Sequence, residues 1–579
     1  MEAKNIPYGL TDFARIQGMN YYYVDKTEYI PRIEQAESYF FLARPRRFGK
    51  SLFINMLTWY YDINRKDRFG EVFVGCHILD NPTAEQGRYL ILSFDFSDVN
   101  PMPDKVFESF EQHCGFRFME FADNYARFFA PGFRDELMAQ PSADAKFAYL
   151  ISKATTLNLP IYLFIDEYDN FANDILARKG QGDYNILISE DSFFQRFFAR
   201  IKAGTIGDRA IKRAFITGIS PIVRKSVGFG TDMSDDVYFN GLMGFYESEL
   251  TDMLEYYDSE LLLSDPIDKI MEIITLWCGG CCFSEDAIKV RIYNPVLTLY
   301  FLNYYIPHKE VPYQMVDGNV YSDYAGLRHF IRTNRLSGMY ASIMEEVVGN
   351  GMISAGIDIG YPVESLVWPD NFKSLLYYFG LLFPHVAEHE MLMLGIPNFT
   401  VRHQVYSLLI EAYNVNNVIP LDLSALSDLV VNMAYKGEWE PVFRYLASEL
   451  ERQDQIRDFI EGEAHVKSFL MAYLGMVNGY IIRPEYEATK GYDGFYMMPD
   501  RLHQPLIAYS YIVKVTYLRV AASDGDFEDL RNEAVGQLQR YAADPLVAQT
   551  KYLTQLGLIL LIFRGKYLEL CEKVELPVR

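Results

Sequence analysis

The sequence predicts an α/β protein, with a parallel-sheet domain first, a helical region in the middle and a smaller α/β domain at the C-terminal end. Two observations carry this prediction. Residues 1–225 alternate short apolar runs with helical patterns, which is typical of a parallel sheet covered by helices. After Glu463, helix and strand patterns alternate again. A chain of 579 residues is also too long for a single core.

The strands of the first domain are expected at short, mostly apolar runs, because a strand buried on both faces is apolar throughout. These runs are Ser38–Ala43, Tyr89–Phe96, Ile161–Ile165 and Arg213–Thr217. Between the last two, phenylalanines at helical spacing predict an amphipathic helix over Asp191–Ala203. The Gly- and Asp-rich stretch Gly228–Asp236 is expected to be a loop.

Four domains follow from these patterns: a parallel-sheet domain over 1–228, a helical lid over 229–310, a helical middle region over 311–450 and an α/β domain over 451–579. The last is expected to contain two helices, Glu463–Leu474 and Phe527–Ala542. Its expected strands are Tyr480–Arg483, Gly494–Met498, Ala508–Thr516 and Leu556–Phe563.

Composition narrows the expected partners and compartment. The formal charge of −23 gives no support to DNA binding through phosphate neutralisation, although a local basic groove is not excluded. The longest apolar run, near Leu556–Phe563, is far too short to span a bilayer, and the N-terminus lacks a signal-peptide pattern. Six cysteines do not suggest a disulfide framework. We therefore expect a cytoplasmic protein without a membrane partner.

A phosphate-binding loop is predicted where the first strand gives way to a helix over Leu52–Tyr61. In that context backbone N–H groups and the helix N-terminus point at an anion. Lys50 would reach the β- and γ-phosphates of ATP or another nucleoside triphosphate, and the Ser51 hydroxyl would ligate Mg²⁺. The common pattern has glycine at its first position, where this chain has Arg44. The residues expected to bind the nucleotide are Arg44, Pro45, Arg46, Arg47, Phe48, Gly49, Lys50, Ser51 and Leu52.

Two further strands end in polar residues, and ligands of open α/β sheets bind at the edge where strands end. Asp166 would hold Mg²⁺ through water, and Glu167 would polarise the water that attacks the γ-phosphate. Thr217 either senses the γ-phosphate or satisfies local backbone.

These segments resemble the bacterial AAA-ATPase-like family of the Bacteroidetes type, whose members carry a C-terminal PD-(D/E)xK nuclease-like domain. The resemblance rests on Tyr23–Thr27, Arg44–Leu52, Phe164–Tyr168, Phe215–Ile219, Asn240–Glu249 and Tyr293–Pro295. It implies a P-loop core of the AAA+/STAND type, in which Arg46 and Arg47 contact phosphate or a partner.

The same resemblance implies a nuclease-like site in the C-terminal domain. It places Glu463 and Asp493 at metal-binding positions, and Gln537 with Tyr541 on a neighbouring helix. Where the family has Glu-x-Lys, this chain has Lys514 and Thr516, and a cation cannot replace a carboxylate as a metal ligand. The site is therefore expected to be degenerate, and the alternatives are an active nuclease or a rearranged site that uses the Lys514 ammonium.

One weaker motif is Cys278-Gly-Gly-Cys281-Cys282. A closed zinc site needs four ligands and no second cysteine pair is apparent, so small buried residues are the favoured interpretation.

The resulting hypothesis is an ATP-binding and ATP-hydrolysing switch that couples nucleotide state to an inactive nuclease-like domain. Two alternatives stay open: a nucleotide-gated DNA nuclease of a defence or mobile-element system, and a non-hydrolysing interaction scaffold. A protein partner or a homo-oligomer is compatible with each of them.

Overall fold

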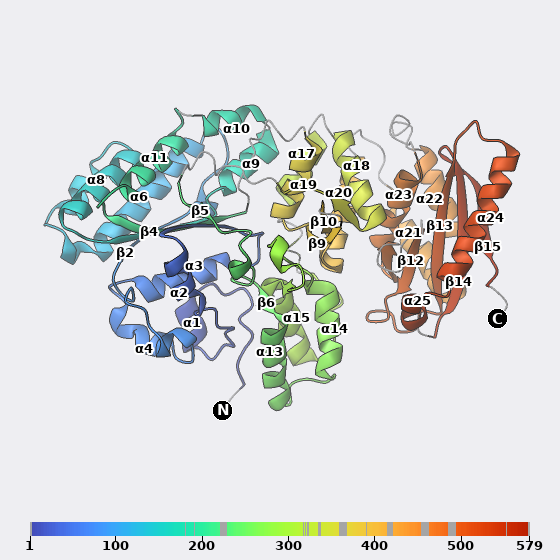
Figure 1. Ribbon diagram of the computed structural model, residues 1–579, viewed down its shortest axis with the longest axis horizontal. Coiled ribbons are helices and arrows are strands. Elements are labelled where there is room, and N and C mark those ends of the chain that lie inside the picture. The colour runs from blue at the N-terminus through green and yellow to red at the C-terminus, as the bar shows by residue number, and fades with distance from the viewer. Residues whose placement is uncertain are drawn as a thin grey trace. The chain divides into compact units, whose positions relative to one another are not determined.

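The computed structural model describes residues 3–576 except 180, 190, 220–228, 317, 319, 321–323, 334–336, 358–367, 389–390, 414–420, 453–461, 485–493 and 552. Its contacts group into two compact units (Figure 1). The first unit comprises Met1–Phe330 and Gly356–Pro384, and the second comprises Ile331–Ala355 and His385–Arg579. The predicted middle region, 311–450, thus contributes residues to both units.

The first unit is built on a five-stranded sheet with the order β2-β3-β4-β1-β5, in which every pair of neighbours is parallel. The strands are β1 (Tyr39–Ala43), β2 (Leu90–Asp95), β3 (Ile161–Asp166), β4 (Ile211–Gly218) and β5 (Thr231–Asp232). All four predicted strands are confirmed to within a few residues. The loop expected over Gly228–Asp236 is corrected in part, because it contains the short edge strand β5.

Helices cover both faces of this sheet (Figure 1). Figure 1 shows α6 (Val106–Asn124), α8 (Ala143–Thr156) and α11 (Phe193–Thr205) on one side, and α3 (Lys50–Tyr61) with α2 (Tyr29–Ala36) on the other. Every residue of β3 is buried, which explains its uninterrupted apolar sequence. Smaller helices complete the layer: α1 (Phe13–Gly18), α4 (Phe69–Val72), α5 (His77–Asp80), α7 (Phe133–Met138), α9 (Asn170–Lys179) and α10 (Gln181–Ile188).

The remainder of the first unit is mainly helical, as the sequence predicts. It contains α13 (Glu247–Ser259), α14 (Ile267–Cys278), α15 (Pro295–His308) and α19 (Pro369–Tyr378), with a two-stranded sheet of β6 (Phe245–Tyr246) and β7 (Ile292–Tyr293). The chain passes between the units three times: within α17 (Ala325–Thr333), between Ala355 and Gly356, and within β9 (Phe383–Glu388).

The second unit is built on a mixed five-stranded sheet in the order β11-β12-β13-β14-β15, whose only parallel pair among described strands is β13 with β14. Its strands are β11 (Tyr480–Pro484), β12 (Gly494–Pro499), β13 (Tyr509–Leu518), β14 (Gln555–Arg564) and β15 (Tyr567–Val574); β15 was not predicted. Its helices are α18 (Ser337–Asn350), α20 (Phe399–Tyr413), α21 (Leu423–Lys436), α22 (Glu440–Arg452), α23 (Glu463–Gly475), α24 (Asp524–Tyr541) and α25 (Pro545–Thr550). A small sheet has the order β8-β10-β9, with β8 at Met352–Ser354 and β10 at Met391–Gly395.

The predicted fold class is therefore confirmed: a parallel-sheet domain, a helical region and a C-terminal α/β domain. None of the helices in the described part of the chain is long and apolar enough to span a membrane.

Candidate nucleotide-binding site

The loop between β1 and α3 has the local geometry of an anion-binding turn. Gly49 precedes α3 with φ +91°, and Arg47 also lies in the left-handed region, with φ +72°. A β-carbon at Gly49 would meet nothing within 4 Å, so the backbone angle is what favours glycine there. Residues in such conformations turn successive backbone N–H groups toward one concavity, and the α3 N-terminus adds its own N–H groups.

Two side-chain contacts join the loop to the end of β3. The Lys50 ammonium lies 3.0 Å from Glu167 Oε1 and donates to the carbonyls of Arg44 (3.1 Å) and Pro45 (3.2 Å). The Ser51 hydroxyl donates to Asp166 Oδ2 at 2.6 Å. The structure thus brings both predicted motifs to one edge of the sheet.

The carboxylates at this edge are electrostatically unusual. Burial raises the pKa of Asp166 to about 7, helped by the negative charge of Glu167 and opposed by Lys50 and Ser51. Glu167 has φ +49°, a conformation that L-residues rarely adopt, and its Oε2 atom is buried with no hydrogen-bond partner among the described residues. Strain and an unsatisfied oxygen at one carboxylate are typical of a functional group.

Sequence analysis missed one acidic neighbour. Asp95 ends β2 directly opposite Asp166 in the strand register, and it lines the cavity beside the phosphate-binding loop. Its side chain accepts from the backbone N–H of Ser97 at 3.0 Å. The available signal was an aspartate at the end of an apolar strand, the same signal that identified Asp166.

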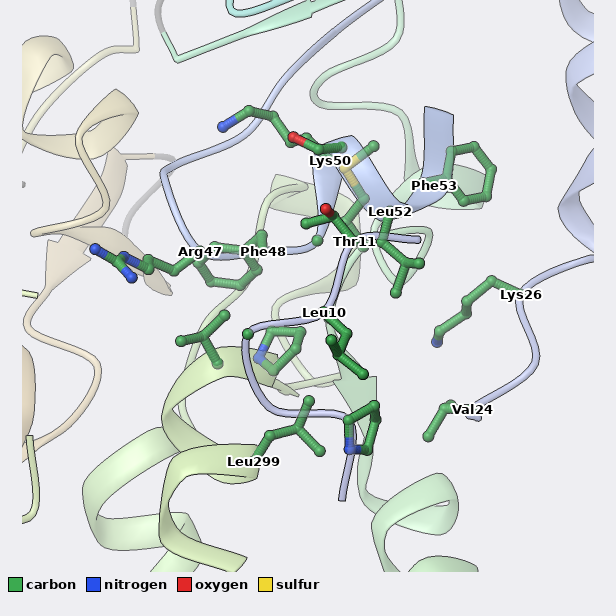
Figure 2. Close-up of a pocket in the computed structure, with 18 of the residues that line it drawn as sticks. Leu10, Thr11, Val24, Lys26, Arg47, Phe48, Lys50, Leu52, Phe53 and Leu299 are labelled. Carbon is green, nitrogen blue, oxygen red and sulfur yellow. The ribbon is translucent and has the colours of Figure 1, made fainter. Parts of the chain in front are cut away.

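A cavity of about 760 Å³ opens in front of the loop (Figure 2). Residues 46–52, together with Asp95 and Glu167, line one part of it. The rest is largely apolar, and its lining side chains include Leu10, Val24, Phe245, Met253 and Leu299. Figure 2 shows Leu10 and Thr11 between the loop and Leu299. Sequence analysis did not identify the segment 7–11 as part of the site, because it precedes every motif.

Lys26 also lines the cavity, from the segment that carries the family resemblance. Its ammonium binds Glu249 Oε1 at 2.6 Å and the carbonyl of Gly241 at 3.1 Å. Glu249 in turn accepts from the backbone N–H of Tyr246 at the start of α13. This ion pair fixes α13 to the segment that precedes α2.

Arg44 is not among the residues that line the cavity, and its expected contact with the nucleotide stays a prediction. Its side chain is 1% exposed and donates to the carbonyls of Ser234 (2.7 Å) and Phe239 (2.9 Å). The guanidinium lies 4.1 Å from the centre of the Phe283 ring, and burial lowers its pKa to about 10. Pro45 is likewise absent from the lining of the cavity. Arg44, which stands where the common pattern has glycine, therefore anchors the loop to the backbone at Ser234 and Phe239.

Two other predicted residues, Arg46 and Arg47, line the cavity. Arg46 donates to Asn170 Oδ1 at 2.8 Å, and Figure 2 shows the Arg47 guanidinium directed away from Leu10 and Lys26. Thr217 is fully buried, donates to the carbonyl of Leu42 at 2.6 Å and is not among the residues lining the cavity. The hydrogen bond to Leu42 matches the local backbone role, and the γ-phosphate-sensing role of Thr217 stays a prediction.

The residues predicted for the nuclease-like site lie in the second unit. Lys514 and Thr516 alternate along β13 and therefore share a face, and the Lys514 ammonium lies 3.5 Å from Glu463 Oε1 at the start of α23. Asp493 is outside the described residues, but the adjacent Gly494 pairs with Lys514.

The other two residues predicted for that site lie on α24. Gln537 donates to Glu533 Oε1 at 3.2 Å, and Tyr541 is near the helix end. Thr516 Oγ1 is buried without a hydrogen-bond partner in the part of the chain that the structure describes. No group of three His, Cys, Asp or Glu side chains among the described residues could hold a metal ion.

The cysteine segment is buried rather than reactive. Cys278, Cys281 and Cys282 are all buried, and burial raises the pKa of each thiol, to about 12 for Cys278. A thiol with a raised pKa is a poor nucleophile and a poor metal ligand. The segment instead positions the following residue, Phe283, beneath Arg44.

Comparisons with known proteins match the N-terminal and the C-terminal α/β domains to two different families. Residues 7–228 match the sequence model of a family described as Predicted AAA-ATPase, and residues 461–573 match that of the PD-(D/E)XK nuclease superfamily. The chain thus resembles an AAA-ATPase-like domain and a nuclease-superfamily domain joined in that order, as predicted.

Two individual proteins are also similar. The "Uncharacterized protein in vnfD 5'region" of Azotobacter chroococcum is 27% identical over 308 residues, which are 51% of each protein. The chain thus spans about half the length of this curated relative. The solved structure of the Aeropyrum pernix ORC2 protein, titled as ADPNP and ADP complexes, has a TM-score of 0.32 and 10% identity. It is covered over 91% of its length and this chain over 67%, and so distant a likeness supports no conclusion on function.

Proposed function

We propose that the first unit binds ATP, or another nucleoside triphosphate, with Mg²⁺ in the cavity in front of the phosphate-binding loop, and hydrolyses it. One observation carries the proposal: Ser51 meets Asp166 at 2.6 Å, and Lys50 meets Glu167 at 3.0 Å, beside a cavity of about 760 Å³. That volume lies within the range of small-molecule sites. The match of residues 7–228 to a predicted ATPase family supports the same assignment.

The residues divide the work by chemistry. Backbone N–H groups of the loop and of the α3 N-terminus bind the phosphates, and the Lys50 ammonium exchanges Glu167 for the β- and γ-phosphate oxygens. The apolar part of the cavity, which includes Leu10 and Leu299, receives the base and ribose.

Ser51 and Asp166 would hold Mg²⁺. A hydroxyl and a carboxylate are suitable ligands for a cation that keeps several waters and completes its shell with phosphate oxygens. Burial raises the pKa of Asp166 to about 7 and so disfavours its ionised form. A cation bound nearby would stabilise that ionised carboxylate, which supports this role. When bound, the ion neutralises charge on the phosphate oxygens.

Glu167 is the candidate general base. Its buried Oε2 has no hydrogen-bond partner among the residues that the structure describes, and its other oxygen is released when Lys50 turns to phosphate. A carboxylate freed in this way can accept a hydrogen bond from the attacking water and orient it.

The test compares wild type with Lys50→Ala and Glu167→Gln in two assays, titration with a fluorescent ATP analogue and release of inorganic phosphate. We expect Lys50→Ala to lose binding, and Glu167→Gln to bind normally but release phosphate at background rate. Equal release by all three proteins would remove the hydrolysis claim. Binding without release in wild type would favour the non-hydrolysing scaffold.

We further propose that the nuclease-like domain is inactive and responds to nucleotide state as part of a switch. The Lys514 ammonium beside Glu463 supports this, since a cation at this position repels a divalent metal. Incubation with Mg²⁺ or Mn²⁺ and DNA tests it, and cleavage that Asp493→Ala abolishes would support the nuclease alternative. A cytoplasmic location and a protein or self-association partner belong to the same proposal.

A further inference from the structure

The phosphate-binding loop packs against residues that follow it by more than two hundred positions in sequence. We call Phe283, Tyr377, Gly380 and Phe383 the buttress; all of them belong to the first unit. The Phe283 ring packs edge-on against Phe48 of the loop, with 5.1 Å between ring centres, and against Phe383 at 5.4 Å. The same ring lies beneath the Arg44 guanidinium.

Hydrogen bonds fix the buttress at several points. The Tyr377 hydroxyl donates to the carbonyl of Phe283 at 3.0 Å, and the backbone N–H of Phe283 donates to Asn240 Oδ1 at 2.7 Å. Arg291 donates to the carbonyl of Pro384, immediately after Phe383, at 2.6 Å. Charge-assisted and buried hydrogen bonds of this kind resist displacement.

The closest approach is between Gly380 and Pro45. Gly380 has φ +76°, and a β-carbon there would lie 2.8 Å from Pro45 Cβ and 2.9 Å from its Cγ. Real β-carbons do not come so close to other carbons, so glycine is required both by the backbone angle and by the loop.

The buttress acts on the same residues that hold the phosphate-binding lysine. Lys50 donates to the carbonyls of Arg44 and Pro45, the residues that contact Phe283 and Gly380. When Lys50 leaves these carbonyls for a phosphate, they must find other partners or shift. Tightly packed groups pass such shifts on rather than absorbing them.

We propose that the buttress residues are positioning residues for the phosphate-binding loop, and that they carry the state of the loop to β9. The inference rests on the proposed nucleotide site and names its route of regulation. β9 begins at Phe383 in the first unit, and the chain passes into the second unit after Pro384. A change at Pro45 and Phe48 therefore reaches, through Gly380 and Phe383, a strand within which the chain passes from the first unit to the second.

The experiment compares Gly380→Ala with Gly132→Ala. Gly132 also lies in the first unit with a positive φ, +88°, but a β-carbon there would meet nothing within 4 Å. Both substitutions strain the backbone, and only Gly380→Ala presses on Pro45. We expect Gly380→Ala to weaken ATP-analogue binding about tenfold and Gly132→Ala to leave it unchanged. Equal loss in both variants, or none in either, would overturn the inference.

Two further measurements separate this inference from the proposed function. Pro45→Gly combined with Gly380→Ala removes the pressing atoms and should restore part of the lost affinity, as a double-mutant cycle measures.

The second measurement is hydrogen exchange without nucleotide, followed over residues 44–53 and 383–388. If wild type binds no ATP, the proposed function fails. Faster exchange in both segments in Gly380→Ala, but not in Gly132→Ala, would still support the positioning role, and unchanged exchange would refute it.

Discussion

Each unit contains a buried lysine paired with a glutamate, and the two pairs differ in what surrounds them. Lys50 lies 3.0 Å from Glu167 and Lys514 lies 3.5 Å from Glu463, with side-chain exposures of 4% and 5% for the lysines. The first pair borders a large cavity and a second pair of magnesium-compatible ligands. In the second pair, Lys514 stands on β13, a strand paired on both sides, and Glu463 begins α23.

Under the proposed function, the difference means that an ion pair becomes a binding site only when a ligand can take the place of one partner. A phosphate entering the cavity can replace Glu167 at Lys50, because both are anions at the same ammonium. At Lys514 the cation stands where the family resemblance expects a metal ligand, so a divalent cation there meets repulsion.

The largest expected effect tests this difference directly. Lys50→Ala should weaken ATP binding by roughly 100-fold or more, because two phosphates lose a charge-assisted contact in a buried site. Lys514→Ala should leave ATP binding unchanged. Isothermal titration calorimetry of both variants measures the contrast, and similar losses in both would mean that the pairs are not functionally distinct.

Changing Arg44 to the glycine of the common phosphate-loop pattern should destabilise the protein. Arg44→Gly should lower the free energy of unfolding by about 3 kcal/mol, because the carbonyls of Ser234 and Phe239 lose a buried donor. Urea denaturation measures this, and unaltered stability would contradict the anchoring role.

Restoring the Glu-x-Lys pattern of the nuclease-like domain, by the double change Lys514→Glu and Thr516→Lys, should create Mn²⁺ binding that wild type lacks. Calorimetry detects this binding.

The next prediction concerns pH and depends on Asp166, whose folded-state pKa is about 7. A raised carboxyl pKa adds stability below the unfolded value of about 4, and this is lost as pH rises through about 7. Magnesium needs the ionised form, so affinity for Mg²⁺–ATP should fall about tenfold per pH unit below that value. Asp166→Asn should bind more weakly and without this pH dependence, and titrations from pH 5 to about 8 would decide.

The smallest expected effect is at the cysteine segment. Because Cys278, Cys281 and Cys282 are buried with raised pKa values, a thiol reagent should not modify them in the native protein at neutral pH. Mass spectrometry after brief alkylation measures this. Rapid labelling of Cys281 would show that the segment opens in solution.

The elements that local sequence could predict are those whose chemistry lies within one strand, loop and helix. Gly49, Lys50 and Ser51 lie between an apolar strand and a helix, and Asp166 ends another apolar strand. Local sequence therefore predicts that the two motifs meet at one edge of the sheet. The C-terminal strands were likewise marked by apolar runs. β5 and β15 were missed because short or partly exposed edge strands lack such runs.

The contacts that sequence could not predict are long-range. Arg44 reaches carbonyls about 190 positions further on, and no local pattern indicates that its side chain turns inward. The same holds for Gly380, whose partner is Pro45, and for Leu10, which meets the cavity from a segment with no motif. Thr217 was ambiguous because a strand-end hydroxyl serves a ligand or the backbone equally well.

The alternation of the chain between its two units has a consequence for synthesis on the ribosome. The first unit needs Gly356–Pro384, which follows a stretch, Ile331–Ala355, that belongs to the second. Domains of most nascent proteins fold in order as they emerge. Here Tyr377 and Gly380, which pack behind the loop between β1 and α3, are made only after Ile331–Ala355 of the second unit. The nascent first unit is therefore still incompletely packed when α18 of the second unit has already been made.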